Sequence, residues 1–165
     1  MPGAQRVLDV GGGHGEYAVE FARRGLRSVM QDRPGVVELA RRKGRLSAAG
    51  VELLAGDFFE SLPAGPFDLV FCAGVTYTYD AENNIELYRR LKPLLVPGGV
   101  LALHTFLRGT DPLASIFAVQ MLMATGAADT HGEDDYRKWL SDTGFHTVDF
   151  KRLERRPEWM VLASP

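Results

Sequence analysis

V-L-D-V-G-G-G-H-G-E, residues 7–16, is the stretch that decides the fold of this chain. Val7, Leu8 and Val10 form a short apolar run with β-branched residues, which is typical of a buried parallel strand. Three glycines follow, and residues 16–24 then space apolar side chains at helical intervals. The order strand, glycine turn, helix predicts a ligand site where bare backbone meets the positive end of a helix.

The glycine spacing and one acidic residue narrow the class of ligand. A dinucleotide site has the pattern G-x-G-x-x-G; Gly11 and Gly13 fit it, but the third glycine position holds Glu16, and the additional glycine is Gly15. Asp9 lies just inside the strand end, where a carboxylate would repel a pyrophosphate. It suits a ligand with an ammonium and a sulfonium group, such as S-adenosylmethionine (SAM). The alternative is a tight turn in which Asp9 only caps backbone amides.

Length and composition indicate one globular domain, which we expect to span residues 1–165. The formal net charge of −2 shows no electrostatic footprint for nucleic acid. The single cysteine, Cys72, excludes an internal disulfide and fits a reducing compartment, so we expect a cytoplasmic location. We expect no signal peptide. The longest apolar stretch, residues 112–128, is short for a membrane span and predicts a buried helix.

Two further candidate ligand contacts stand at the ends of the next two predicted strands, residues 27–31 and 51–55. Asp32 follows the glycine turn by about 20 residues, the spacing at which an acidic side chain can bind a ribose diol; a helix N-cap is the alternative. Asp57 and Phe58 follow the third strand, where a carboxylate can accept from an adenine amino group and a ring can pack on the base. In open α/β sheets, ligands bind beyond these carboxyl ends.

The rest of the chain continues the alternation of strands and helices, which predicts a mainly parallel sheet with helices on both faces. Asp80 is the predicted N-cap of one helix; a metal site at this acidic helix start is the less favoured interpretation. The predicted elements are a helix over 34–49, a strand over 67–73, a helix over 81–95, a strand over 100–105, helices over 112–125 and 134–143, and a closing hairpin over 145–153 and 159–163.

Within the helix over 112–125, apolar side chains share one face, which predicts core packing. Gln120 and Met121 are the two residues of this face that we expect to line a pocket, because a polar group in an apolar stripe needs a partner. The helix is predicted to stop at Gly126. Residues 130–133 resemble a capping box for the following helix.

With these elements placed, the chain resembles the SAM-dependent methyltransferases of the Rossmann-like class. More narrowly, it resembles the catalytic domain of plant-type O-methyltransferases and their bacterial relatives that act on polyketides, carotenoids and phenazines. The resemblance implies a seven-stranded α/β sheet with one antiparallel strand and SAM as cofactor, with Asp32 at the ribose and Asp57 and Phe58 at the adenine. It is carried by L-D-V-G-G-G-H-G at 8–15, D-R-P at 32–34, G-D-F-F at 56–59, P-G-G at 97–99 and G-F at 144–145. The further cofactor-binding candidates are Asp9, Gly11, Gly12, Gly13 and Ala73.

Three departures from this family's pattern bear on activity. The family carries an N-terminal helical dimerisation domain and helices that cover the cofactor, and we expect this chain to lack both. Tyr77 stands where the family usually has a basic histidine, and Ala73 stands where plant members often have a lysine. Thr130 stands at the place of the expected acidic partner. The usual general base and the residue that orients it are therefore both replaced.

Three outcomes remain open for the proton of an acceptor hydroxyl. The acceptor is acidic enough by itself; or Tyr77, His104 or His131 takes the proton; or transfer is lost. For each histidine, a hydrogen-bonded or solvent-exposed structural role is the simpler alternative, and Tyr77, with an ordinary pKa of about 10, is a better pocket wall than a base.

The leading hypothesis is a SAM-dependent methyltransferase acting on a hydroxyl of a small apolar or aromatic molecule. The first alternative is a SAM-binding or interaction module without turnover. The second, an NAD-dependent oxidoreductase, is disfavoured by Asp9 and Glu16. We expect no metal, nucleic-acid or membrane partner, and we expect that exposed apolar surface could drive homo-oligomerisation.

Overall fold

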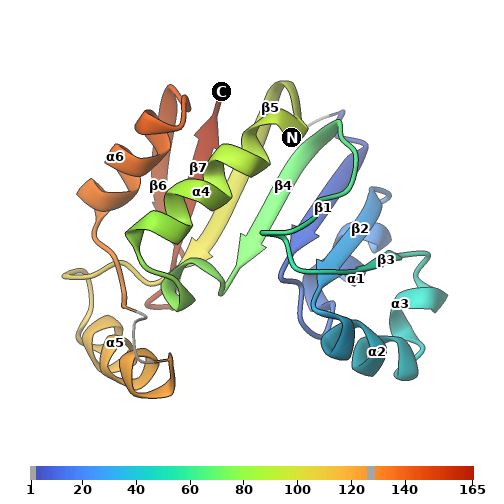
Figure 1. The fold of residues 1–165 in the computed structure, drawn as a ribbon, viewed down its shortest axis with the longest axis horizontal. Helices are drawn as coiled ribbons and strands as arrows, with labels where there is room; N and C mark the ends of the chain where they lie inside the picture. The colour runs from blue at the N-terminus through green and yellow to red at the C-terminus, as the bar shows by residue number, and fades with distance from the viewer. Residues whose placement is uncertain (1–2, 126–128) are drawn as a thin grey trace.

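The computed structural model describes residues 3–125 and 129–165, which form one seven-stranded sheet with helices on both faces (Figure 1). The strand order is β3-β2-β1-β4-β5-β7-β6, and within this sheet β7 alone runs antiparallel to its neighbours. The predicted α/β class, with seven strands of which one is antiparallel, is confirmed. The strands are β1 Arg6–Val10, β2 Arg27–Asp32, β3 Glu52–Ala55, β4 Phe67–Ala73, β5 Leu95–Thr105, β6 Thr147–Arg152 and β7 Trp159–Ser164.

Two layers of helices enclose the sheet. Helices α4 (Ala81–Leu91) and α6 (Glu133–Asp142) cover the face over β4, β5, β7 and β6 (Figure 1). The main core lies beneath them and includes the fully buried Leu8, Tyr88 and Tyr136, together with Cys72 of β4. Helix α1 (Glu16–Arg23) packs on the opposite face, where a smaller core continues toward the partly buried side chains of Leu69, Met160 and Leu162.

The helix predicted over residues 34–49 is wrong as a single element, because the chain breaks it at a glycine. Helix α2 spans Pro34–Arg42 and a short α3 spans Arg45–Ala48. Gly44 between them has a φ of 68°, a left-handed conformation that glycine adopts at little cost and that a continuing helix excludes. The chain therefore turns, and Leu46 enters the core shared by α1, α2 and β2.

The boundary between α4 and β5 also differs from the prediction. Helix α4 ends at Leu91, and a 3₁₀ turn, Lys92–Leu94, follows. Pro93 has no N–H to donate, which explains why the α-helix does not continue. Strand β5 then begins at Leu95 and includes the predicted P-G-G turn, and its register with β4 shifts after the pair Phe67–Leu95. The predicted strand over 100–105 is only the second half of β5.

Helix α5 has the predicted bounds, Pro112–Thr125, but its predicted burial is wrong. Leu113 is 53% exposed, Ile116 64% and Val119 59%; among residues 112–124, Ala114 alone is buried. The helix stands apart from the sheet beside the carboxyl ends of its parallel strands (Figure 1). An apolar stripe predicts that a face is to be covered, but not that the same chain covers it. The predicted stop at Gly126 lies outside the described residues.

The capping box predicted over residues 130–133 is wrong in its residues, because the last helix is capped by Gly132 and Asp135. The carboxylate of Asp135 accepts a 2.8 Å hydrogen bond from the backbone N–H of Gly132, which is the N-cap of α6. Thr130 is buried, and its hydroxyl lies 3.5 Å from the carbonyl oxygen of Ala114. A threonine could not cap the helix from there. The closing hairpin of β6 and β7 is as predicted.

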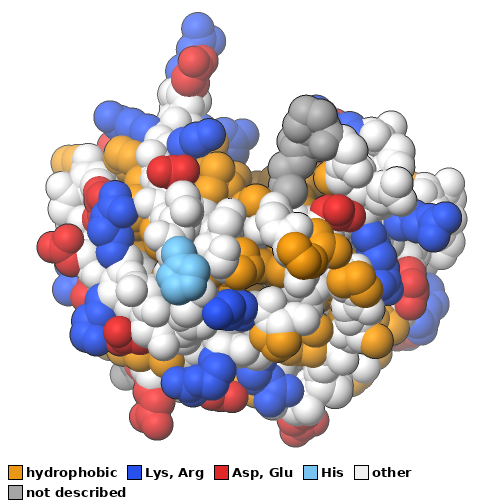
Figure 2. Space-filling model, turned by 90° about the horizontal axis from the view of Figure 1, so that it is seen from above, with side chains coloured by type: hydrophobic (Ala, Val, Ile, Leu, Met, Phe, Trp, Pro, Cys, Tyr) orange, Lys and Arg blue, Asp and Glu red, His pale blue; other side chains and the backbone are white. Residues whose placement is uncertain are grey.

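The surface carries charges of both signs. On the face drawn in Figure 2, basic and acidic side chains are interspersed around a middle region with exposed hydrophobic side chains. Among the residues that the structure describes, no helix has the length and apolar character needed to cross a membrane.

Candidate active site

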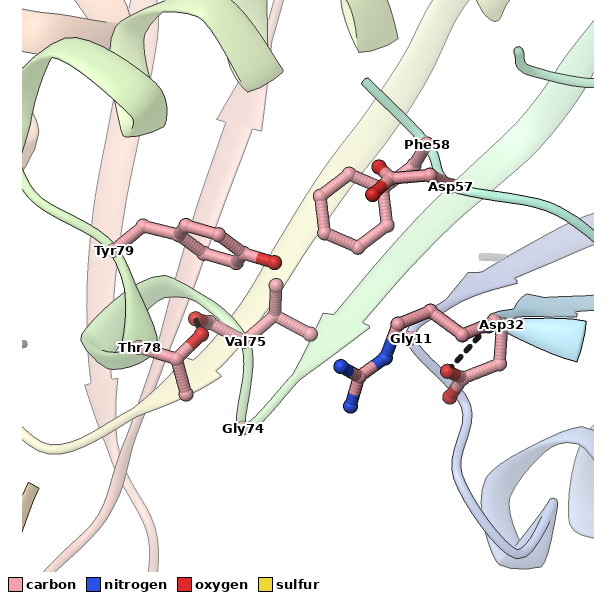
Figure 3. A pocket seen from close by; sticks show the side chains of 9 residues that line it. Gly11, Asp32, Asp57, Phe58, Gly74, Val75, Thr78 and Tyr79 are labelled. Carbon is pink, nitrogen blue, oxygen red and sulfur yellow. Dashed lines mark hydrogen bonds between the residues drawn. The ribbon is translucent and has the colours of Figure 1, made fainter. Parts of the chain in front are cut away.

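A cavity of about 380 Å³ opens at the point where the strand order reverses, between β1 and β4. In doubly wound sheets, this switch point at the carboxyl ends of the strands is where ligands bind. Four segments meet there: the glycine turn after β1, the end of β2, the segment after β3 and the loop after β4 (Figure 3). The lining residues are Gly11, Asp32, Arg33, Asp57, Phe58, Gly74, Val75, Thr78 and Tyr79.

The glycine turn allows two loops to touch without side chains between them. Gly11 has a φ of 68°, and a Cβ on it would lie 2.6 Å from Cγ2 of Val75, a contact that real Cβ atoms do not make. Gly13 has a φ of 58° and donates its backbone N–H to the carboxylate of Asp32 at 2.8 Å. The bare backbone predicted for this turn is therefore present, and Gly11 is the glycine of the three that lines the cavity.

Asp9 lies beneath this turn and does not line the cavity, in contrast to the expectation that it faces the ligand. It is fully buried, and neither carboxylate oxygen has a hydrogen-bond partner among the described residues. Gly12 covers it, since a Cβ there would lie 2.8 Å from Oδ2. Burial raises the pKa of Asp9 to about 7; the nearby N–H of Ala18 opposes this without reaching hydrogen-bond geometry, and the charge of Asp32 adds to it.

Asp32 joins the end of β2 to the glycine turn. Besides the bond from Gly13, its Oδ1 accepts from the backbone N–H of Arg33 at 2.7 Å. The N-cap of α2 is Arg33, which makes no side-chain cap, so Asp32 does not fill the alternative role of N-cap. Its carboxylate borders the cavity, as Figure 3 shows.

The opposite side of the cavity combines a carboxylate with aromatic rings. Asp57 accepts from the backbone N–H of Phe59 at 2.8 Å, which directs its carboxylate group beside Phe58. Phe58 packs edge-on against Tyr79, with ring centroids 5.8 Å apart. The hydroxyl of Tyr79 points into the space in front of Phe58 (Figure 3). Burial, and next the charge of Asp57, raise the pKa of Tyr79.

Sequence reasoning did not single out Tyr79, Val75, Thr78 or Arg33 as lining residues. Three of these four lie in the loop after β4, whose sequence has neither helical nor strand periodicity. The signal that could have identified them is their place after a central strand at the switch point.

Tyr77 borders a second, aromatic region next to the cavity. It lies in the 3₁₀ turn Thr76–Thr78, and its ring packs edge-on against Phe117 of α5, with centroids 4.7 Å apart. Phe117 in turn stacks on Phe106 at 4.4 Å. A Cβ on Gly74 would lie 2.7 Å from the Tyr77 hydroxyl, so that hydroxyl sits over the Gly74 backbone. Burial, and then the charge of Glu158, raise the pKa of Tyr77, which keeps it protonated at neutral pH.

The other predicted pocket residues lie outside the cavity. Gln120 is exposed on α5 and Met121 is partly buried, and neither lines the cavity. Phe117 is the α5 residue in contact with Tyr77. Ala73 packs in the smaller core and directly precedes Gly74, which does line the cavity.

The two candidate histidines occupy different surroundings. His131 is 6% exposed; its Nε2 lies 3.0 Å from the carbonyl oxygen of Tyr79, and its ring contacts Trp139 of α6. His131 therefore links the loop after β4 to α6 and does not line the cavity. His104, at the carboxyl end of β5, is half-buried, with its ring 6.1 Å from that of Tyr17. Burial lowers the pKa of His104, while the charge of Glu158 acts in the opposite direction.

Metal-binding geometry is not found in the part of the chain that the structure describes: no three His, Cys, Asp or Glu side chains there are grouped to hold an ion. The cavity instead offers two carboxylates, an aromatic wall and bare backbone. This combination suits a nucleoside with a ribose diol and a planar base.

The sheet order and the switch-point cavity define a Rossmann-like fold of the methyltransferase class. The structure superimposes on that of mitomycin 7-O-methyltransferase with a TM-score of 0.87 and 28% identity, over 98% of this chain and 49% of that one. Human N-acetylserotonin methyltransferase in complex with SAM gives a TM-score of 0.86 at 25% identity, over 97% and 47%. Residues 1–146 match the O-methyltransferase domain family, and the chain belongs to it.

Relatives of known activity are similar over most of this chain. The 3-amino-4-hydroxybenzoate 4-O-methyltransferase of Streptomyces cremeus is 31% identical over 150 residues, which are 87% of this chain and 41% of that protein. The mitomycin biosynthesis 6-O-methyltransferase of Streptomyces lavendulae is 33% identical over 148 residues, 86% and 42% respectively. The chain thus spans about two fifths of the length of these relatives.

Proposed function

We propose that this chain binds SAM and transfers its methyl group to a hydroxyl of a small aromatic or apolar molecule. The observation that carries the proposal is the cavity at the β1–β4 switch point, with the carboxylates of Asp32 and Asp57 on its two sides. Membership of the O-methyltransferase domain family supports the reaction type.

The residues present fit the cofactor. Asp32 would accept from the ribose hydroxyls, and Asp57 would accept from the adenine amino group beside the ring of Phe58. Gly11 and Gly74 carry no side chain, so that Val75 and the Tyr77 hydroxyl lie directly against bare backbone at the edge of the cavity. The charged lining residues are Asp32, Asp57 and Arg33, a balance that disfavours a pyrophosphate and therefore the NAD alternative.

The aromatic region of Tyr77, Phe106 and Phe117 is the proposed acceptor wall. When bound, SAM supplies a methyl group that the sulfonium already activates, so that the protein mainly aligns the acceptor and excludes water. The Streptomyces cremeus relative is named for a hydroxybenzoate and a Streptomyces sahachiroi relative for a hydroxynaphthoate, which supports an aromatic acceptor here.

Calorimetry with SAM tests the cofactor half of the proposal. We expect saturable binding that Asp57→Ala weakens, whereas Asp149→Asn, an exposed carboxylate on β6, leaves it unchanged. No heat and no shift in melting temperature at millimolar SAM would overturn the proposal. Incubation with methyl-labelled SAM and a set of phenols then tests transfer.

A SAM-binding module without turnover is the second candidate function. It is favoured by one observation: Tyr77 stands at the expected base position, and burial raises the pKa of its phenol further. Saturable SAM binding without label transfer to any phenol would favour this module.

We further propose that the chain self-associates through α5. The exposed side chains of Leu113, Ile116 and Val119 form an apolar surface there, and Leu122 and Met123 extend it. Light scattering across a concentration series tests this: Ile116→Glu should shift the mass toward the monomer, while Ser141→Glu, an exposed position on α6, should not. A wild-type chain that stays monomeric throughout would refute self-association.

A further inference from the structure

His104 of β5 and Glu158, the residue directly before β7, lie at the same end of two neighbouring antiparallel strands. His104 of β5 pairs directly with Met160 of β7. Glu158 precedes Met160 by two residues and so extends the same side of the ladder, where its carbonyl accepts from the N–H of Leu153. Diagonal neighbours of this kind lie about 7–8 Å apart, within reach of long side chains.

The carboxylate of Glu158 carries an unsatisfied acceptor. Its Oε2 is buried and has no hydrogen-bond partner among the described residues. A buried acceptor without a donor is costly, so the site favours a ligand or a side chain that brings a proton. The charge of Glu158 raises the pKa of both His104 and Tyr77. At His104 it opposes the larger effect of burial, and at Tyr77 it acts in the same direction as burial.

The backbone of His104 joins this pair to the edge of the cofactor cavity, whose lining residues include neither of the two side chains. The carbonyl oxygen of His104 accepts a 3.0 Å hydrogen bond from the N–H of Gly74, which lines the cavity and underlies the Tyr77 hydroxyl. On the other side, the His104 ring is near that of Tyr17, in the first turn of α1 directly after the glycine turn. His104 therefore lies beside the helix that follows the glycine turn and beside the start of the loop that carries Tyr77.

We propose that His104, positioned by Glu158, takes the proton of the acceptor hydroxyl in place of Tyr77. The inference rests on the proposed function. The imidazole lone pair binds the hydroxyl proton, and the electrons of the O–H bond remain on the oxygen. The pair changes from a net charge of −1 to 0, and the imidazolium then releases the proton to solvent. His104 is the catalytic residue and Glu158 the positioning residue.

Other groups face His104 from the elements around it. Tyr17 lies on α1, and Tyr77 lies above Gly74. The charge of Arg156, in the hairpin before β7, also lowers the pKa of His104. Its effect is smaller than the lowering by burial and smaller than the opposing effect of Glu158. Because burial dominates, His104 is neutral at physiological pH, the protonation state that a base requires.

A titration of the histidine resonances by NMR tests the pairing without turnover. Removal of the Glu158 charge in Glu158→Gln should lower the pKa of His104, which the spectrum of His104→Gln assigns. Glu154→Gln, an exposed carboxylate in the same hairpin, is the matched control and should leave it unchanged. His146 is an internal reference. An unchanged His104 pKa in Glu158→Gln would overturn the pairing.

Label transfer to the set of phenols tests the base. His104→Gln should lower kcat about 100-fold, a typical effect of a general base, with the KM for SAM unchanged. The loss of rate toward low pH should also disappear, and the deficit should shrink with phenols acidic enough to ionise unaided. His146→Gln is the control. A rate within about twofold of wild type with every phenol would overturn the proposal.

If His104→Gln does not fold, Glu158→Gln decides: a lower kcat with an acid limb moved to lower pH supports the pair, and an unchanged profile refutes it. SAM binding without transfer to any phenol overturns this inference and leaves the cofactor site intact. Absence of SAM binding overturns the proposed function, while the NMR titration still decides whether Glu158 and His104 interact.

Discussion

The backbone N–H of Gly13 donates a 2.8 Å hydrogen bond to Oδ2 of Asp32, which joins the turn after β1 to the end of β2. The same carboxylate accepts from the N–H of Arg33. One side chain thus holds the conformation of the glycine turn while its exposed part borders the cavity. Cofactor affinity and the shape of the turn should therefore change together.

Asp32→Ala should weaken SAM binding by about 10- to 100-fold, since a hydrogen bond to a charged group contributes about 1.5–3 kcal/mol. The melting temperature should also fall, because Gly13 loses its acceptor. Calorimetry and thermal unfolding measure the two effects. Full affinity in the variant would show that the ribose is bound elsewhere.

Gly11→Ala should abolish measurable SAM binding. The new Cβ would meet Cγ2 of Val75 at 2.6 Å, and the φ of 68° disfavours any side chain. Gly35→Ala is the matched control, because nothing lies within 4 Å of its Cβ and α2 favours alanine. The control should bind normally and gain about 0.5–1 kcal/mol of stability. Normal binding by Gly11→Ala would contradict the close approach of the two loops.

The pKa of Asp9 predicts an unusual dependence of stability on pH. Burial raises this pKa from 3.8 to about 7 in the folded state, so the folded chain binds the proton more tightly than the unfolded chain. The contribution of Asp9 is fully present below about pH 4 and is lost as the pH rises to about 7, by an amount on the order of 1.4 kcal/mol per pKa unit. Asp9→Asn should remove this loss.

Urea unfolding of wild type and Asp9→Asn at pH 5 and pH 8 measures the effect. The difference between the two proteins isolates Asp9 from the other titrating groups. The variant should be the more stable of the two at pH 8, and its advantage should shrink at pH 5. An advantage equal at both pH values would contradict a raised pKa.

Asn84 holds the loop that carries Tyr79. Its buried side-chain amide lies 2.9–3.0 Å from the carbonyl oxygens of Thr76, Tyr79 and Asp80. Asn84→Ala should destabilise the fold by about 1–3 kcal/mol, because the three carbonyl oxygens lose the one donor group that they share, and should weaken SAM binding as the loop loosens. Asn83→Ala, one residue earlier and exposed, keeps the backbone N–H that Asp80 caps and should have little effect. Equal losses in the two variants would contradict the role of Asn84.

Sequence reasoning reached the parts of the site that local pattern determines. The glycine turn, Asp32 and the pair Asp57–Phe58 each follow a strand with a clear apolar run, and parallel strands bring their carboxyl ends together. The number of strands and the one antiparallel strand, in contrast, are predicted by the family resemblance.

What sequence reasoning missed depends on contacts between distant elements. The relation of His104 to Glu158 comes from the register of β5 with β7, which no local pattern specifies. The burial of Asp9 beneath Gly12 depends on how α1 sits on the sheet. The exposure of α5 depends on which surface is available to cover it, and apolar spacing carries no information on that.

The lone thiol of Cys72 lies near the carboxyl end of β4, the middle strand of the sheet. It is fully buried, and burial first and the charge of Asp9 second raise its pKa far above the ordinary range. In the folded chain it is therefore closed to oxidants and alkylating reagents, which attack the thiolate. Its rate of modification would therefore measure how often the centre of the sheet opens to solvent.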